Sequence, residues 1–113
     1  MEARAQLALA SIFAGIAFNE AGVHMGHSTA HALGHLYHIP HGVCCALVTP
    51  AIIEFAAKTH LNKIKKIGEA MGISVNSDDP IVIGKEVADS VRALIKEVEL
   101  PSLKKQEFTK EQI

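Results

Sequence analysis

Apolar residues recur along this chain with the spacing of helices, and almost no segment alternates as a half-buried strand does. Residues 2–21 consist mostly of good helix formers and carry apolar side chains on nearly every face. Residues 61–71 and 81–98 are amphipathic, with polar residues opposite an apolar stripe. We therefore predict helices over these three ranges. Because the first of them is apolar all round, we expect it to be buried in a larger body than a three-helix domain.

Glycine and proline set the expected boundaries of these helices. Gly22 is a suitable C-cap for the first helix, and Pro40 ends a second helix over about 23–37. A third helix over 41–57 contains Pro50, which is expected to kink or divide it. Residues 74–80 form a polar loop, and a further helix is expected to start at Thr109. The predicted fold class is all-α, with five or six helices.

Composition removes several classes of function. The 113 residues allow one domain, and 49% apolar with 20% charged residues is typical of folded proteins. A net charge of −1, no basic stripe and 4% aromatic residues argue against a nucleic-acid partner.

The chain also shows no sign of export or membrane insertion. The N-terminus lacks the charged start of a signal peptide, and the apolar runs 7–18 and 42–53 are shorter than the roughly 20 residues of a membrane span. The adjacent Cys44 and Cys45 cannot link distant segments, so we interpret both as small buried hydrophobic residues. A reducing, cytoplasmic compartment without a membrane partner is expected.

Six of the seven histidines fall between His24 and His41. Spacings of three and four place five of them on one side of the helix over 23–37: His24, His27, His31, His35 and His38. His27 and His31 have the four-residue spacing with which a helix presents two imidazoles to one metal. His41 follows the break at Pro40, so the chain can turn and bring it back to the same point. Neutral imidazoles suit Zn²⁺ and Fe²⁺, and this set leaves coordination positions open, as a catalytic metal requires.

Individual histidines have a simpler interpretation. Taken singly, His24, His35 and His38 are typical structural or solvated residues, as is the isolated His60. The density of the whole cluster favours metal chemistry over that interpretation. No glutamate lies between His27 and His31, so the pattern does not fit a zinc protease.

At these residues the chain resembles the iron-dependent (group III, metal-containing) alcohol dehydrogenase family. The similar segment runs from the spaced His27 and His31, through Leu33-Gly34, to Tyr37-x-x-Pro40-His41-Gly42-Val43 and an apolar helix reaching Pro50. The preceding Ala14–Asn19 segment and the following Lys66–Gly72 segment also resemble helices of the family. The resemblance covers nearly the whole chain and weakens after about Asn76.

The resemblance implies a metal-dependent, NAD(P)-linked dehydrogenase acting on a small alcohol or aldehyde. In the family an N-terminal nucleotide-binding domain and a C-terminal helical domain enclose a divalent metal, usually iron and sometimes zinc. An Asp and a His from an earlier helix bind that metal together with two further histidines, which correspond to His27 and His41. His31 corresponds to a histidine for which a catalytic role in substrate binding or proton relay is implied.

The chain departs from the family in what precedes the histidines. It has no glycine-rich turn after a strand, and its only earlier acidic residues are Glu2 and Glu20. We therefore expect residues 1–113 to be a single helical domain fragment with half of the metal site and no nucleotide-binding domain. Such a chain should be inactive alone and should form homo-oligomers through residues 5–18 or 43–53.

Two alternatives to the dehydrogenase fragment stay open at this point. One is a fragment of a lyase with the related dehydroquinate-synthase-like fold. The other is a non-enzymatic, histidine-rich, metal-binding helical module. The sequence also leaves open Fe²⁺ or Zn²⁺, NAD or NADP, and which alcohol is the substrate.

Overall fold

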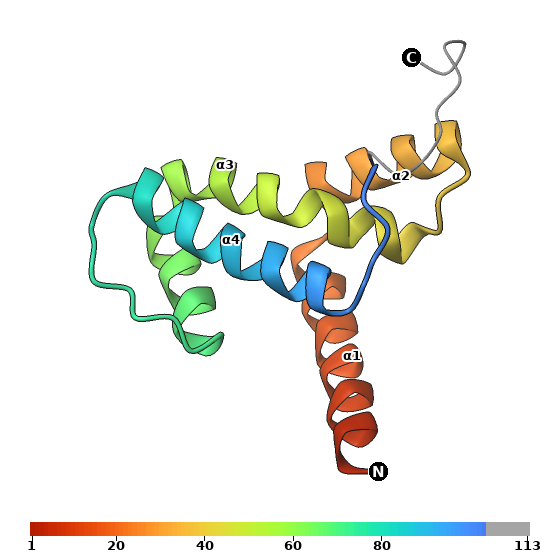
Figure 1. Cartoon of the computed structure of the whole chain (residues 1–113), viewed down its shortest axis with the longest axis horizontal. Helices are drawn as coiled ribbons and strands as arrows, with labels where there is room; N and C mark the ends of the chain where they lie inside the picture. The colour runs from red at the N-terminus through yellow and green to blue at the C-terminus, as the bar shows by residue number, and fades with distance from the viewer. Residues whose placement is uncertain (104–113) are drawn as a thin grey trace.

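The computed structural model describes residues 1–103 and contains, within them, α-helices and no strand. In chain order the helices are α1 (Glu2–Ala21), α2 (Met25–Tyr37), α3 (His41–Ala70) and α4 (Pro80–Glu97), as Figure 1 shows. The all-α prediction is confirmed, and so is the interpretation of residues 81–83 as the start of a helix. The expected helix from Thr109 lies outside the described residues.

Helix α3 confirms one prediction and corrects another. Its 30 residues consist of two helices joined across a kink at His60, which lies between the helices predicted over 41–57 and 61–71. Pro50 lies inside it and is buried, and the non-helical dihedral angles fall at His60 instead (φ −130°, ψ 40°). The expected break at Pro50 is therefore wrong. A proline removes one hydrogen bond, and the packing of α2 and α4 against α3 keeps the helix continuous across that loss.

The main core lies between α3 and α4, which run side by side in Figure 1. Its buried members are Ile53, Ala57, Ile64, Ile83, Val87 and Ala88. The backbones come close at Gly84, where an added Cβ would lie 2.8 Å from the Ala57 Cβ and 3.3 Å from the Glu54 Cα. Arg92 reinforces the pair by bonding Glu54 across the interface at 2.7 Å.

A second, smaller core joins α2 to the beginning of α3. Ala30 on α2, Ile39 in the connection and Cys44 on α3 are buried together. The Cys44 thiol donates to the Ile39 carbonyl at 3.7 Å. This cluster holds the first turn of α3 beside the middle of α2, and so it determines where His41 lies relative to the histidines of α2.

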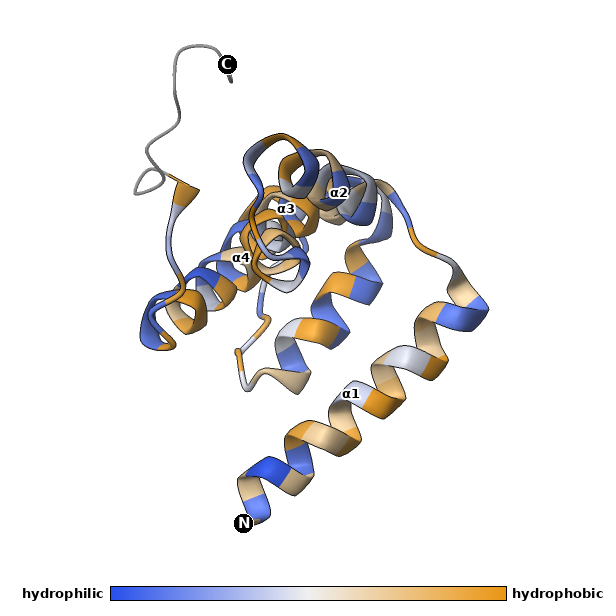
Figure 2. Cartoon of the chain, turned by 90° about the vertical axis from the view of Figure 1, so that its right-hand side faces the viewer, coloured by the Kyte–Doolittle hydropathy of each residue, from blue (hydrophilic) through white to orange (hydrophobic). Residues whose placement is uncertain are grey.

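Helix α1 projects away from the other three helices (Figures 1 and 2). It contains no buried residue, and its large apolar side chains are exposed at Leu7, Leu9, Ile12, Phe13, Ile16 and Phe18. The chain turns at Gly22, whose φ of 72° suits glycine and whose N–H donates to the Phe18 carbonyl at 2.8 Å. The C-cap predicted at Gly22 is confirmed. The expected burial of this helix is not found within the described part of the chain.

α3 is longer than the apolar run 42–53 that lies within it, and its length bears on whether it could span a membrane. By length and composition alone, α3 is able to cross a bilayer, and α1 with α2 passes the same test only as a pair bent by 110°. Residues 42–53 lie within this longer helix, so the length of that run alone does not exclude a membrane span. In the structure α3 packs against both α2 and α4.

Candidate metal centre

The two outer histidines of the predicted stripe lie at the ends of α2 and not on its face. His24 is the N-cap residue, and its Nδ1 accepts a hydrogen bond from the Gly26 N–H at 3.2 Å. His38 follows the last helical residue in the left-handed conformation, with φ of 53°. The prediction that five histidines share one side of the helix is therefore wrong for these two, because the helix is shorter than expected at its start and the chain turns at His38.

The structure brings His27, His31 and His41 together. The ring centroids of His27 and His31 lie 6.0 Å apart on α2, one helical turn from each other. His41, the first residue of α3, lies 5.5 Å from His27 and 4.9 Å from His31 by the same measure. The chain thus reverses at Pro40 and returns the third imidazole to the first two, as the sequence predicts. His35 has no ring contact with this group among the described residues.

Cys45 joins this cluster. One potential ligand atom from each of His27, His41 and Cys45 lies within 4.8 Å of the other two. The closest approach is 3.4 Å, between the Cys45 Sγ and the His41 Nε2. His31 does not belong to this ligand group, although its ring lies against His41. Two imidazoles and a thiol suit borderline or soft divalent ions such as Fe²⁺ and Zn²⁺, and they do not suit Mg²⁺ or Ca²⁺.

Sequence reasoning gave both cysteines the same role, and the structure separates them. Cys44 is fully buried in the α2–α3 core, as expected, whereas Cys45 is half-buried beside the His41 ring. The four-residue spacing of His41 and Cys45 on one helix is the signal that could have identified it. Burial raises the pKa of the Cys45 thiol, and the neighbouring Cys44 adds to that shift. This direction is opposite to the one that activates a nucleophilic cysteine.

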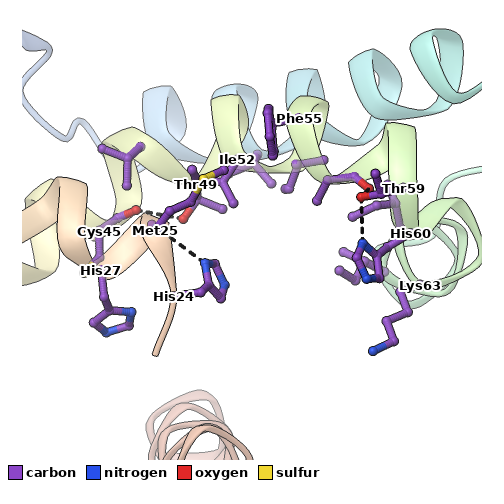
Figure 3. A pocket seen from close by; sticks show the side chains of 17 residues that line it. His24, Met25, His27, Cys45, Thr49, Ile52, Phe55, Thr59, His60 and Lys63 are labelled. Atoms are coloured by element: carbon purple, nitrogen blue, oxygen red, sulfur yellow. Dashed lines mark hydrogen bonds between the residues drawn. The ribbon is translucent and has the colours of Figure 1, made fainter. Parts of the chain in front are cut away.

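A groove of about 770 Å³ runs along α3 from this cluster (Figure 3). One end is formed by His24, His27 and Cys45, and apolar side chains such as Ile52 line its length. At the far end His60 shares a 2.8 Å hydrogen bond with the Thr59 hydroxyl. His60 thus lies at the opposite end of the groove from His27 and Cys45.

The chain is similar to one described protein family. The family described as "Fe-containing alcohol dehydrogenase family, C-terminal" matches residues 1–113. The chain belongs to this family. The resemblance predicted from the histidine motif is therefore confirmed, and this membership favours the dehydrogenase over the lyase alternative.

Individual relatives of this chain are also named as dehydrogenases. The chain is 34% identical over 93% of its length to an NADPH-dependent butanol dehydrogenase of Clostridium saccharobutylicum, covering 26% of that protein. It is 31% identical over 89% of its length to a 1,3-propanediol dehydrogenase of Klebsiella pneumoniae, again covering 26%. It is 41% identical over 70% of its length to alcohol dehydrogenase 4 of Saccharomyces cerevisiae, covering 21%. The chain thus spans about a quarter of the length of these curated relatives. No solved structure is significantly similar to it.

The two cofactors of such dehydrogenases fit this chain differently. The imidazole and thiol donors described above fit a divalent metal. A dinucleotide does not fit, because residues 1–103 contain neither a strand nor a glycine-rich turn leading from one into a helix. We therefore assign no described residue to NAD(P).

Proposed function

We propose that this chain is the metal-binding helical part of an NAD(P)-linked alcohol dehydrogenase that acts on a small alcohol or aldehyde. The observation that carries the proposal is the meeting of His27, His31 and His41 at the α2–α3 junction in a chain of this family. The relatives' names, a butanol and a propanediol dehydrogenase, support the substrate class. The free thiols of Cys44 and Cys45 support a reducing, cytoplasmic compartment.

In this proposal His27 and His41 hold the metal, Fe²⁺ or alternatively Zn²⁺. When bound, such an ion supplies Lewis-acid polarisation of a substrate oxygen. The contribution of the protein is to fix two imidazoles from different helices at one point. The buried Ala30–Ile39–Cys44 cluster does this by locking α3 onto α2.

His31 is the proposed proton carrier. Its side chain is exposed, and its ring lies 4.9 Å from that of His41, so it can exchange a proton with solvent while lying beside the metal ligands. Imidazole is the side chain best suited to such exchange near neutral pH. Because His31 lies outside the ligand group, its nitrogen atoms are available for this role.

The hydride-accepting nucleotide and the remaining metal ligands belong, in this proposal, to the part of the relatives that the chain does not match. We therefore expect the 113-residue chain to oxidise no simple alcohol with NAD(P). Measurable oxidation of butanol by the purified chain, followed through NAD(P)H absorbance, would contradict the proposal that the nucleotide site and the remaining metal ligands lie outside the matched part of the relatives.

Metal affinity tests the ligand assignment directly. We expect the double variant His27→Ala/His41→Ala to bind Zn²⁺ or Fe²⁺ at least tenfold more weakly than the parent chain in anaerobic calorimetry. His35→Ala is the matched control, because His35 is exposed on the same helix and lies outside the ring cluster. Equal affinity of the double variant and the parent would remove His27 and His41 as ligands. Affinity as tight as that of a complete site would favour the non-enzymatic metal module.

We also infer that the chain associates with itself through α1. The support is the exposure of its apolar side chains, since contiguous apolar surface of this kind marks interaction sites. Residues 43–53 are the weaker choice, because Cys44, Pro50 and Ile53 are already buried. Phe13→Glu should shift the chain to monomer in analytical ultracentrifugation, and a parent chain that is monomeric at high concentration would overturn this inference.

A further inference from the structure

We propose that Phe18 is a positioning residue for the metal site, because its ring holds the His27 imidazole in the orientation that a metal ligand needs. This inference rests on the proposed metal role of His27 and adds a residue of α1 to the site. Neither the family membership nor the relatives' names assign a function to Phe18.

The first argument is the contact between the two rings. The centroids of the Phe18 and His27 rings lie 6.3 Å apart, and their planes are tilted by 44°. This separation falls within the range of about 4.5–7 Å over which aromatic rings attract each other. The two residues belong to different helices, and the bend of 110° between α1 and α2 brings the end of the first beside the start of the second.

The second argument is that the turn between the helices fixes both backbones. The Phe18 carbonyl accepts the Gly22 N–H at 2.8 Å, and this bond closes α1. On the other side of the turn, the His27 N–H donates to the His24 carbonyl at 2.9 Å in the first turn of α2. These bonds involve only main-chain atoms. A substitution of the Phe18 side chain therefore removes the ring contact and leaves the turn in place.

The third argument is that no hydrogen bond fixes the His27 ring within the described residues. A histidine that binds a metal almost always donates from its second ring nitrogen to a carboxylate, a carbonyl or water, and this bond orients the ring. In residues 1–103 the hydrogen-bonded histidine rings are those of His24, His41 and His60. The His27 side chain is only half-buried, so several staggered rotamers are open to it. Ring packing is then what selects the rotamer that faces His41.

Phe18 differs from the other rings around His27 in its chemistry. The rings of His31 and His41 also lie beside His27, but both are exposed and both titrate near neutral pH. The Phe18 ring neither binds a metal nor changes its charge. It therefore supports His27 in the same way with and without the ion.

Titration with Zn²⁺ followed by NMR tests the proposal on the 113-residue chain. In the metal-free parent we expect a nuclear Overhauser effect between the ring protons of Phe18 and His27. The His27 ring resonances should then shift as Zn²⁺ is added. Phe18→Leu should weaken this binding about two- to tenfold, which corresponds to the strength of an aromatic pair. The loss arises because a ring that samples several rotamers binds in proportion to the fraction that is competent.

Two further variants separate the ring contact from a general effect on α1. Phe18→Tyr keeps the ring and should bind Zn²⁺ as the parent does. Phe13→Leu is the matched control, because Phe13 is 60% exposed against 53% for Phe18 and makes no ring contact in the described chain. Neither leucine variant should change thermal unfolding, since α1 contains no buried residue. Weaker zinc binding by Phe18→Leu would then not be a consequence of unfolding.

The outcomes separate this proposal from the proposed function. A loss of affinity confined to Phe18→Leu supports the role of Phe18. Unchanged affinity of Phe18→Leu, an equal loss in Phe13→Leu, or the absence of the Overhauser effect overturns that role and leaves His27 and His41 as ligands. If Zn²⁺ shifts the ring resonances of neither histidine in the parent chain, the histidine assignment on which both proposals depend is rejected.

Discussion

Helices α1 and α4 have similar lengths, but only α4 has buried residues in the described chain. α1 is the more apolar of the two, yet none of its residues is buried. α4 is more polar and buries Ile83, Gly84, Val87 and Ala88. Figure 2 shows apolar residues on several sides of α1, which stands apart, whereas α4 lies against α3. Apolar content alone therefore did not decide which helix enters the core.

The distribution of the apolar residues explains the difference. In α4 they form one stripe at helical spacing, and Gly84 within that stripe lets the backbone approach Ala57 closely. In α1 they surround the helix, so no single partner face could cover them. A one-sided helix finds its partner within this chain, and an all-round apolar helix requires several partners. The predictions below test this contrast, beginning with the largest effect.

The same truncation in the two helices should have very different effects. Ile83→Ala removes a side chain with 0% exposure and should lower the free energy of unfolding by about 2–5 kcal/mol. Ile12→Ala in α1 removes one that is 59% exposed and should change it by no more than about 0.5 kcal/mol. Urea denaturation followed by circular dichroism measures both. Equal losses would mean that α1 is packed in solution.

Adding a methyl group should change the stability of the protein in opposite directions in the two helices. At Gly84 a Cβ would collide with Ala57 and crowd the Glu54 backbone, so Gly84→Ala should be destabilising by about 1–2 kcal/mol despite its better helix propensity. At Gly15 nothing lies within 4 Å of the added atom. Gly15→Ala should therefore stabilise helix α1 by up to about 1 kcal/mol, because alanine has the higher helix propensity. Thermal circular dichroism distinguishes the two. A stabilising Gly84→Ala would show that α3 and α4 are further apart than described.

The helix starts differ as well. The Asp79 carboxylate accepts from the Ile81 N–H at 2.8 Å and caps α4, whereas α1 starts at Met1 without a side-chain cap. Asp79→Ala should cost about 1 kcal/mol of unfolding free energy, and Asp79→Asn, which keeps an acceptor, should cost much less. Chemical denaturation at neutral pH compares the three proteins. Equal losses for both variants would exclude the cap as the cause.

The smallest effect concerns the ion pair that ties the loop after α3 back to that helix. Lys65 donates to Asp78 at 2.5 Å, and this bond and its charge lower the pKa of the Asp78 carboxyl. A lowered pKa stabilises the fold above the ordinary aspartate value of about 3.9, and that stability is lost as the pH falls through the lower folded value. Asp78→Asn should therefore differ slightly from the parent at pH 7 and not at all at pH 2, as denaturation at both pH values will show. A difference that persists at low pH would point to a cause other than this charge.

Local rules predicted most of the helices and the three histidines that the structure brings together, His27, His31 and His41. The boundaries at Gly22 and Pro40 and the start of α4 follow from backbone chemistry within a few residues. The errors came where longer-range packing acts. α3 stays helical at Pro50, and His24 caps α2 instead of lying on its face. Cys45 was a different kind of omission, since its spacing from His41 was visible in the sequence but was interpreted together with Cys44.

The sequence by itself determined that this protein is helical, where its chain turns, and which imidazoles could meet, because helix propensity, proline geometry and residue spacing act over a few residues. The tertiary structure alone decided that α4 packs on α3, that α1 stays exposed in the described chain, and how closely His27, His41 and Cys45 approach one another. These outcomes depend on whether two distant faces fit, through contacts such as Gly84 on Ala57 and Ala30 beside Cys44. Such fit is a property of two surfaces together and is not contained in either segment alone.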